Sequence, residues 1–387
     1  FTIQNNFTIS CPFEFLKYKF VHFRPGFNQG SGHNSKWTCF LALFGYDPLR
    51  YDIGRGILEA LGSDVSVSEK DVLIRGNFST VENVGSIIII DDKWAGRITT
   101  DTNKRIIKLL QSKINKIDGV GVEFTSGLEH RFVCKLKFKN KLNSSEVHIL
   151  DTDPEEVGVA PLIPKNLNQK SQKVSKIVVK LVNLIKETLK KENKANYALL
   201  RGFSIYPKIP TFEALYGLKA SSIDTYPIYK GISKLVCMNQ KKKKNNTIES
   251  QFETLIKEYD NYDFFYFHIK KTDSFGEDGN YKKKINVIEE FDKSLRKIQK
   301  LKFDVVCVTG DHSTPTKMKG HSWHPVPVII NSKNSFYGTS KRFTEKECLK
   351  GTLGLFEGKN LMNFILAHGE LLSKFGAWHM MPKWRNW

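Results

Sequence analysis

This sequence lacks closely spaced cysteine pairs and long apolar runs. Its six cysteines are scattered over 387 residues without a C-x-x-C pair, which argues against a disulfide framework and against a structural zinc site. The longest apolar run is about as long as Ile87–Ile90, far short of the ~20 residues that a membrane-spanning helix needs. We therefore expect a soluble protein of a reducing intracellular compartment, either the cytoplasm or an organelle matrix such as that of a mitochondrion.

Acidic residues are also scarce. The chain has 40 Asp and Glu against 60 Lys and Arg, which gives a formal net charge of +20. Lysine runs such as Lys241–Lys244 are typical of a coding bias without function. The alternative is a polyanionic partner, RNA or a ribonucleoprotein assembly, which a positive field of this size attracts through the phosphate backbone. No RRM, KH or helix-turn-helix signature is present, so base-specific recognition is not expected.

The apolar pattern is that of an α/β chain. Amphipathic helices are predicted over 176–191 and 285–300, and short β-branched runs between such stretches predict strands over 86–90, 263–267, 304–308 and 326–330. This alternation favours a mostly parallel sheet flanked by helices. The length suffices for two domains. The chain begins at Phe1 rather than at a methionine, so we expect residues upstream of it.

A metal-ligand pattern follows the predicted strand 304–308. The motif TGDHSTP places Asp311 beside His312, and HSWHPVPV begins nine residues later at His321. Strand ends of open α/β sheets are the usual place for a site. A carboxylate with two imidazoles suits a divalent transition metal such as Mn or Zn. An isolated Asp-His pair is more often a surface or capping pair, but the second motif favours a metal site.

These two motifs resemble the C-terminal metal motifs of archaeal-type 2,3-bisphosphoglycerate-independent phosphoglycerate mutases, which belong to the alkaline phosphatase superfamily. Further blocks resemble that family in the same order, and together they cover nearly the whole chain after Gly30. They are FGYDPLRYDIGRGILEALG (44–62), DVLIRGNFSTV (71–81), WAGRI (94–98), DTDP (151–154), NYALLRG (196–202), YKGI (229–232) and HIKKTDSFGEDGNYKKKINVIEEFD (268–292).

The resemblance implies an alkaline phosphatase-like α/β domain built from residues 1–66 and 213–387, with a smaller α/β phosphotransferase domain, residues 67–212, inserted between them. It also implies two divalent metal ions, Mn with Zn or Mg as alternatives. The implied reaction moves a phosphoryl group of phosphoglycerate onto a serine and back. No membrane association is implied, and the oligomeric state is left open.

The resemblance also assigns roles to individual residues. One metal ion would be bound by Asp273, Glu277 and His321. The other would be bound by Asp311, His312, an N-terminal aspartate and the nucleophilic serine, for which Ser35 is the candidate. The positions where the family binds its substrate are Asp92, Lys93, Arg97, Arg201 and Lys230.

Several positions depart from the family pattern. An ungapped count back from Leu41 places Lys36, not Ser35, at the nucleophile position. A one-residue insertion is needed to restore Ser35, and Ser31 is a remoter candidate. Glu277 replaces a metal-ligand histidine, and Glu155 replaces the histidine of a D-P-D-P-H block. Lys93 and Trp94 replace two adjacent arginines, and neither provides a planar bidentate fork for an anion. The early D-G motif with its metal aspartate is absent from residues 1–24.

Two functional interpretations follow. The favoured one is a divergent homologue whose phosphoryl-transfer site has decayed; two divalent metal ions are expected if the metal site is retained, and none otherwise. This protein would serve as a noncatalytic structural or binding subunit, for example of a ribonucleoprotein such as an organellar ribosome. The alternative is an active metal-dependent phosphoglycerate mutase that interconverts 3- and 2-phosphoglycerate through a phosphoserine.

Overall fold

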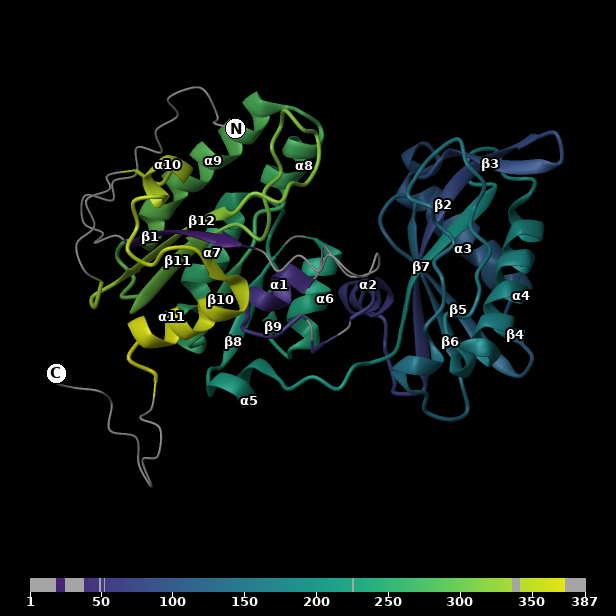
Figure 1. The fold of residues 1–387 in the computed structure, drawn as a ribbon, viewed down its shortest axis with the longest axis horizontal. Coiled ribbons are helices and arrows are strands. Elements are labelled where there is room, and N and C mark those ends of the chain that lie inside the picture. The colour runs from purple at the N-terminus through teal and green to yellow at the C-terminus, as the bar shows by residue number, and fades with distance from the viewer. Residues whose placement is uncertain are drawn as a thin grey trace. The chain divides into compact units, whose positions relative to one another are not determined.

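The computed structural model describes residues 19–24, 38–48, 50–51, 53–224, 226–335 and 342–372. The predicted nucleophile Ser35 lies outside these residues. The chain divides into two compact units, each shown in Figure 1. Unit 1 comprises Phe1–Asp52, Phe212–Thr225 and Met238–Trp387, and unit 2 comprises Ile53–Thr211 and Tyr226–Cys237.

Residues 53–66 and 226–237 pack with unit 2, whereas the sequence analysis assigned both segments to the metal domain. The predicted domain boundaries stay a prediction.

Unit 1 contains two sheets. A three-stranded parallel sheet has the order β10-β8-β9, and a four-stranded mixed sheet has the order β11-β12-β1-β13. The strands are β1 (Lys19–Arg24), β8 (Ala220–Ile223), β9 (Asn239–Gln240), β10 (Phe264–Phe267), β11 (Val305–Thr309), β12 (Val326–Ser332) and β13 (Phe356–Glu357).

The helices of unit 1 begin at recognisable caps. Thr247 accepts a hydrogen bond from the backbone N–H of Ser250, and Asn280 accepts one from that of Lys283, which satisfies N–H groups that the first helical turn leaves without a partner. The helices are α1 (Thr38–Leu43), α5 (Phe212–Tyr216), α7 (Ile248–Glu258), α8 (Lys271–Glu277), α9 (Tyr281–Leu295), α10 (Glu345–Cys348) and α11 (Leu361–His368).

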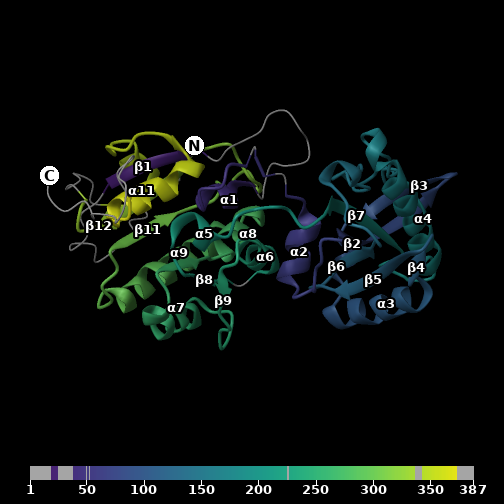
Figure 2. The same cartoon turned by 90° about the horizontal axis from the view of Figure 1, so that it is seen from below.

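Unit 2 is a six-stranded sheet with the order β3-β2-β6-β5-β4, in which β7 also pairs with β2. Its elements are α2 (Arg55–Gly62), β2 (Asp71–Val84), β3 (Ile87–Asp92), α3 (Thr100–Lys113), β4 (Lys116–Ile117), β5 (Val120–Ser126), β6 (Arg131–Lys137), α4 (Gln172–Leu189), β7 (Tyr197–Ser204) and α6 (Pro227–Leu235). Helices α3 and α4 lie together against this sheet, as Figure 2 shows for unit 2.

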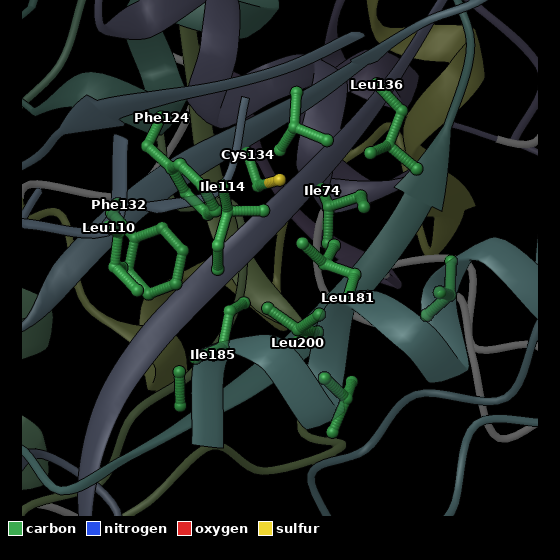
Figure 3. Packing of buried hydrophobic residues seen from close by; sticks show 14 of the residues in the cluster. Ile74, Leu110, Ile114, Phe124, Phe132, Cys134, Leu136, Leu181, Ile185 and Leu200 are labelled. Atoms are coloured by element: carbon green, nitrogen blue, oxygen red, sulfur yellow. The ribbon is translucent and has the colours of Figure 1, made fainter. Parts of the chain in front are cut away.

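The core of unit 2 explains the amphipathic pattern of its sequence. Leu181 and Ile185 of α4 are buried against the sheet face that carries Ile74 and Leu200 (Figure 3). Burial of a large aliphatic side chain contributes about 1.5 to 3 kcal/mol. The apolar stripe predicted between 176 and 191 is therefore a core face and not a ligand site.

Glycines bring helix α2 close to its neighbours in unit 2. A Cβ at Gly56 would lie 2.2 Å from the carbonyl oxygen of Leu73 on β2. A Cβ at Gly231 of α6 would lie 1.9 Å from the carbonyl oxygen of Leu58 on α2. Gly56 and Gly231 thus permit backbone contact on both sides of α2.

None of the helices among the described residues is both long and apolar enough to cross a membrane.

Candidate metal centre and arginine cluster

Two strand ends of unit 1 deliver a group of metal-ligand side chains. β10 is followed by His268 and by α8, whose first turn carries Asp273. β11 is followed, after Gly310, by Asp311 and His312. Asp273, His312 and His321 each offer a ligand atom, and these three atoms lie within 4.8 Å of one another. We call them the metal cluster.

The hydroxyl of Thr314 lies among the three members of the metal cluster. It donates a hydrogen bond to Oδ1 of Asp273 (2.6 Å) and lies 3.0 Å from Nδ1 of His312 and 3.1 Å from Nδ1 of His321. The two Nδ1 atoms are themselves 3.0 Å apart. Hydrogens cannot sit on both nitrogens and point at each other, so at least one lone pair faces into the cluster.

Two further carboxylates flank the metal cluster. Oδ2 of Asp311 lies 2.9 Å from Nε2 of His312, and Oε1 of Glu277 lies 3.4 Å from Nε2 of His321. Burial lowers the pKa of His312, but the hydrogen bond and charge of Asp311 outweigh it and raise that pKa. The hydrogen bond from His321 lowers the pKa of Glu277 against the effect of burial.

A lysine balances the charge of the buried Asp273. Its carboxylate is 9 % exposed, and its Oδ2 accepts a hydrogen bond from Nζ of Lys270. Burial raises the pKa of Asp273, yet the charge and hydrogen bond of Lys270 and the hydroxyl of Thr314 lower it overall. Asp273 is therefore a carboxylate at neutral pH.

These side chains fit a divalent cation. A buried carboxylate and two imidazoles whose nitrogens face one another form a mixed O/N donor set of the kind that Mn²⁺ or Zn²⁺ accepts. A cation between them would relieve the facing lone pairs of the imidazoles. Asp311 and Glu277 would either orient the histidines or add oxygen ligands.

The backbone around the metal cluster is closely fitted. A Cβ at Gly276 of α8 would lie 2.5 Å from the carbonyl oxygen of Thr314, so only glycine permits this approach. An isolated β-bridge between Ser313 and Ser322 closes the loop that joins the two histidines.

A second polar group lies in unit 2, where three neighbouring strands carry arginines. Arg75 of β2 is the cross-strand partner of Arg201 of β7, and Arg131 begins β6 next to β2. Burial and the charges of Arg201 and Arg75 lower the pKa of Arg55, the first residue of α2, to about 10. We call these four residues the arginine cluster.

Acidic residues of unit 2 contact the arginine cluster. Nη1 of Arg201 lies 2.8 Å from Oδ2 of Asp153, and Nη2 of Arg201 contacts Glu155. Nη1 of Arg55 lies 3.8 Å from the same Glu155 carboxylate. Buried Glu59 lies 3.8 Å from Nε of Arg75. The guanidinium groups are thus held in place by internal carboxylates.

The predicted substrate-binding residues all lie in unit 2, and some of them meet. Asp92 accepts hydrogen bonds from the backbone N–H groups of Trp94 and Gly96, so its carboxylate organises the turn after β3. Arg97 lies over the ring of Trp94 at 5.5 Å. The amino group of Lys93 donates to the carbonyl oxygen of Glu155, which links this turn to Arg201.

Lys230 stands apart from that group. It lies on α6, and its backbone N–H donates to the carbonyl oxygen of Tyr226. The structure therefore connects Lys93 and Arg201 through Glu155 and places Lys230 on a separate helix of the same unit.

Several residues next to the metal cluster and the arginine cluster were not predicted from sequence. Thr314 lies inside the TGDHSTP motif, and Lys270 lies three residues before Asp273, so both could have been found from the motifs alone. His130 precedes Arg131, but nothing in its sequence context distinguishes it. Its position near Arg75 becomes apparent only from the pairing of β6 with β2.

Buried His130 predicts a pH dependence of stability. It is 3 % exposed, and burial and neighbouring arginines, Arg131 first, lower its pKa to about 3. The unfolded chain binds a proton near pH 6.5, so the stability of unit 2 is lost progressively as the pH falls from about 6.5 towards 3. Between about pH 6.5 and 4.5, the unfolding free energy of the His130→Gln variant is expected to fall by about 2 kcal/mol less than that of the wild type.

Urea unfolding at a series of pH values, followed by circular dichroism, measures this effect. The exposed His148→Gln variant is the control and should keep the wild-type slope of unfolding free energy against pH. An unchanged slope in the His130 variant would contradict a buried neutral imidazole.

Comparison with known proteins adds an independent line of evidence. The family model for 2,3-bisphosphoglycerate-independent phosphoglycerate mutase matches residues 21–195. A protein named probable 2,3-bisphosphoglycerate-independent phosphoglycerate mutase from Aquifex aeolicus is 49% identical over 353 residues, which cover 91% of this chain and 84% of the relative. One of the same name from Thermus thermophilus is 41% identical over 355 residues, with the same coverage of both chains.

Solved structures agree with these matches. The PH0037 protein of Pyrococcus horikoshii superposes with a TM-score of 0.74 at 26% identity, covering 93% of this chain and 89% of that one. A cofactor-independent phosphoglycerate mutase of Thermoplasma acidophilum shares the fold, with a TM-score of 0.64 at 21% identity over 94% and 92% of the two chains. The predicted alkaline phosphatase-like α/β fold class is confirmed, and the chain belongs to the 2,3-bisphosphoglycerate-independent phosphoglycerate mutase family.

Proposed function

We propose that this protein is an active, metal-dependent phosphoglycerate mutase that interconverts 3- and 2-phosphoglycerate. The observation that carries the proposal is the convergence of Asp273, His312 and His321, whose ligand atoms lie within 4.8 Å of one another. This reverses the preference reached from the sequence, where a decayed, noncatalytic subunit was favoured. The relatives' names support the active enzyme, and no observation beyond net charge favours an RNA or ribonucleoprotein role.

The residues of the metal cluster and their neighbours would have distinct roles in this reaction. Asp273, His312 and His321 would hold a divalent cation, Mn or alternatively Zn or Mg, with Asp311 and Glu277 beside the histidines. Such a cation supplies neutralisation of the charge that develops on a transferring phosphoryl group. Lys270 keeps Asp273 ionised, and Thr314 orients the carboxylate and both imidazoles.

Glu277 is compatible with this activity although the family resemblance expects a histidine there. Its carboxylate lies 3.4 Å from His321, where it can orient the imidazole or bind a hard cation directly. Because oxygen ligands favour Mn and Mg over softer metals, we propose Mn as the working ion.

Unit 2 would supply the anion-binding groups. Arg201, together with Arg55 and Arg75, presents guanidinium groups that match the paired oxygens of a carboxylate or phosphate. Lys93, Arg97 and Lys230 would add positive charge, while Asp92 holds the turn that carries Lys93 and Arg97. A location in a reducing intracellular compartment, where phosphoglycerate is metabolised, is part of the proposal.

A coupled assay tests the proposed activity. We expect the protein with Mn²⁺ to convert 3-phosphoglycerate to 2-phosphoglycerate, detected through enolase as phosphoenolpyruvate, and EDTA to abolish the conversion. Loss of a nucleophile typically costs about 10⁴ to 10⁶ in rate, so a Ser35→Ala variant should be inactive. A Ser31→Ala variant tests the remoter candidate for the nucleophile in the same segment and should stay active if Ser35 is the nucleophile.

Each outcome of the assay decides a separate point. Metal-loaded protein without turnover would rule out the mutase and restore the noncatalytic interpretation. Turnover that survives Ser35→Ala would keep the mutase and reject Ser35 as its nucleophile.

A further inference from the structure

Trp94 is an exposed aromatic residue of unit 2 to which the proposed reaction assigns no role. It stands where the family resemblance expects an arginine, and 47 % of its surface is exposed, although tryptophan is largely buried in most folded proteins. Asp92 fixes its backbone, because the two carboxylate oxygens accept hydrogen bonds from the N–H groups of Trp94 and Gly96. The turn after β3 therefore presents a large, flat apolar ring to solvent.

Two cations border the ring of Trp94. Cζ of Arg97 lies 5.5 Å from the ring centroid, and Nζ of Lys93 lies 5.9 Å from it. Nζ of Lys93 also donates to the carbonyl oxygen of Glu155. In the part of the chain that the structure describes, the guanidinium of Arg97 has no carboxylate partner. Its paired N–H groups can therefore bind the oxygens of a phosphate.

A hollow beside the ring carries carboxylates. Its volume is about 410 Å³, and its lining includes Trp94, Val157, Asp91 and Glu156. Asp91 and Glu156 are both exposed, and neither carboxylate accepts a hydrogen bond from a described residue. A hollow of this size suits a small organic ligand. Carboxylates in such a position can accept hydrogen bonds from ribose hydroxyls, as an acidic residue does in dinucleotide-binding folds.

We propose that this part of unit 2 binds a free ribonucleotide, a nucleoside 5′-monophosphate. Its base would stack on the ring of Trp94, and its phosphate would bind Arg97 beside Lys93. Its two ribose hydroxyls would donate to Asp91 and Glu156. A nucleotide inside an RNA strand has no free 3′-hydroxyl, so the pair of carboxylates favours the free nucleotide.

The nucleotide would be a second ligand of unit 2 and not the substrate of the proposed reaction. Phosphoglycerate has no planar group that could stack on an indole ring. Lys93 and Arg97 also belong to the proposed substrate-binding residues, so the nucleotide would compete with phosphoglycerate for them. Nucleotide binding itself does not depend on the mutase activity.

Calorimetric titration of the whole chain with AMP tests the proposal. AMP is compared with ribose 5-phosphate, which lacks the base, and with adenosine, which lacks the phosphate. We expect AMP to bind at least ~10-fold more tightly than ribose 5-phosphate, because a base that stacks on an aromatic side chain gains affinity from this contact. Adenosine should also bind more weakly than AMP, since it makes no contact with the guanidinium of Arg97.

Substitution of Trp94 locates the bound nucleotide. Trp94→Ala should weaken AMP binding ~10-fold, to the affinity of ribose 5-phosphate. Trp94→Phe, which keeps an aromatic face, should retain most of the AMP affinity. Trp323→Ala is the matched control, because Trp323 of unit 1 is 68 % exposed and lies outside the proposed site. This control should bind AMP as the wild type does.

Three results would overturn the inference. The first is the absence of AMP binding, and the second is equal affinity of the wild type for AMP and ribose 5-phosphate. Both are measured without a substitution that could disturb folding. The third is AMP affinity that Trp94→Ala leaves unchanged, which would place the nucleotide elsewhere. The titrations contain no phosphoglycerate and need no turnover, so their failure and a failure of the mutase assay are separate outcomes.

Discussion

Replacing His312 with alanine is expected to lower kcat/KM for 3-phosphoglycerate about 10³-fold. His312 contacts His321 and Thr314 through Nδ1 and Asp311 through Nε2. Its loss would remove a metal ligand together with the partner that holds Asp311. A cation supplies several kcal/mol of charge stabilisation, and a loss of about 4 kcal/mol corresponds to ~10³ in rate.

The control for this prediction is His324→Ala. His324 belongs to the same HSWHPVPV motif, but it stacks on Trp323 and contacts Ser322 rather than the metal cluster. Mn²⁺ binding, measured by calorimetry, should weaken in the His312 variant and stay unchanged in the His324 variant. A His312 variant that retains both Mn²⁺ affinity and turnover would remove this residue from the metal centre.

Replacing Gly231 with alanine is expected to destabilise unit 2 by about 3 kcal/mol. The new Cβ would lie 1.9 Å from the carbonyl oxygen and 2.7 Å from the carbonyl carbon of Leu58. Both atoms are backbone, so no side chain can move aside and the two helices α2 and α6 must separate. Alanine gains only about 1 kcal/mol over glycine in helix propensity, so the clash decides the sign.

Gly121→Ala provides the matched control. The Cβ at this position would lie 3.4 Å from Cβ of Lys137, which is ordinary contact, so its unfolding free energy should change little. Urea unfolding monitored by circular dichroism measures both variants. Equal stability of the two would mean that α2 and α6 pack less closely than the structure describes.

Much of the secondary structure followed from the sequence pattern. The predicted strands at 263–267, 304–308 and 326–330 correspond to β10, β11 and β12, and the helix predicted at 176–191 corresponds to α4. These segments have long or purely apolar patterns, and such patterns determine the secondary structure locally. The start of α4 at Gln172 was missed, because the polar stretch before residue 176 carries no apolar periodicity.

The metal cluster and the arginine cluster differ in how much of each could be predicted from the sequence. Asp311 and His312 are adjacent in the chain, so their shared position at a strand end was predictable. Arg75 and Arg201 are 126 residues apart in sequence and meet only through the register of β2 and β7. The family resemblance singled out Arg201, but no local pattern sets that register, so its position beside Arg75 could not be predicted from the sequence.

Glu155 provides the arginine cluster with an internal anion that competes with incoming ligands. The carboxylate contacts both Arg201 and Arg55, yet the side chain is 61 % exposed and can rotate into water. It acts as a tethered competitor, whose effective concentration at the guanidinium groups is of the order of millimolar or higher. An incoming phosphate or carboxylate must therefore displace the Glu155 carboxylate from the guanidinium groups. Weakly binding anions of the cell would not displace it, whereas a ligand with several anionic groups would.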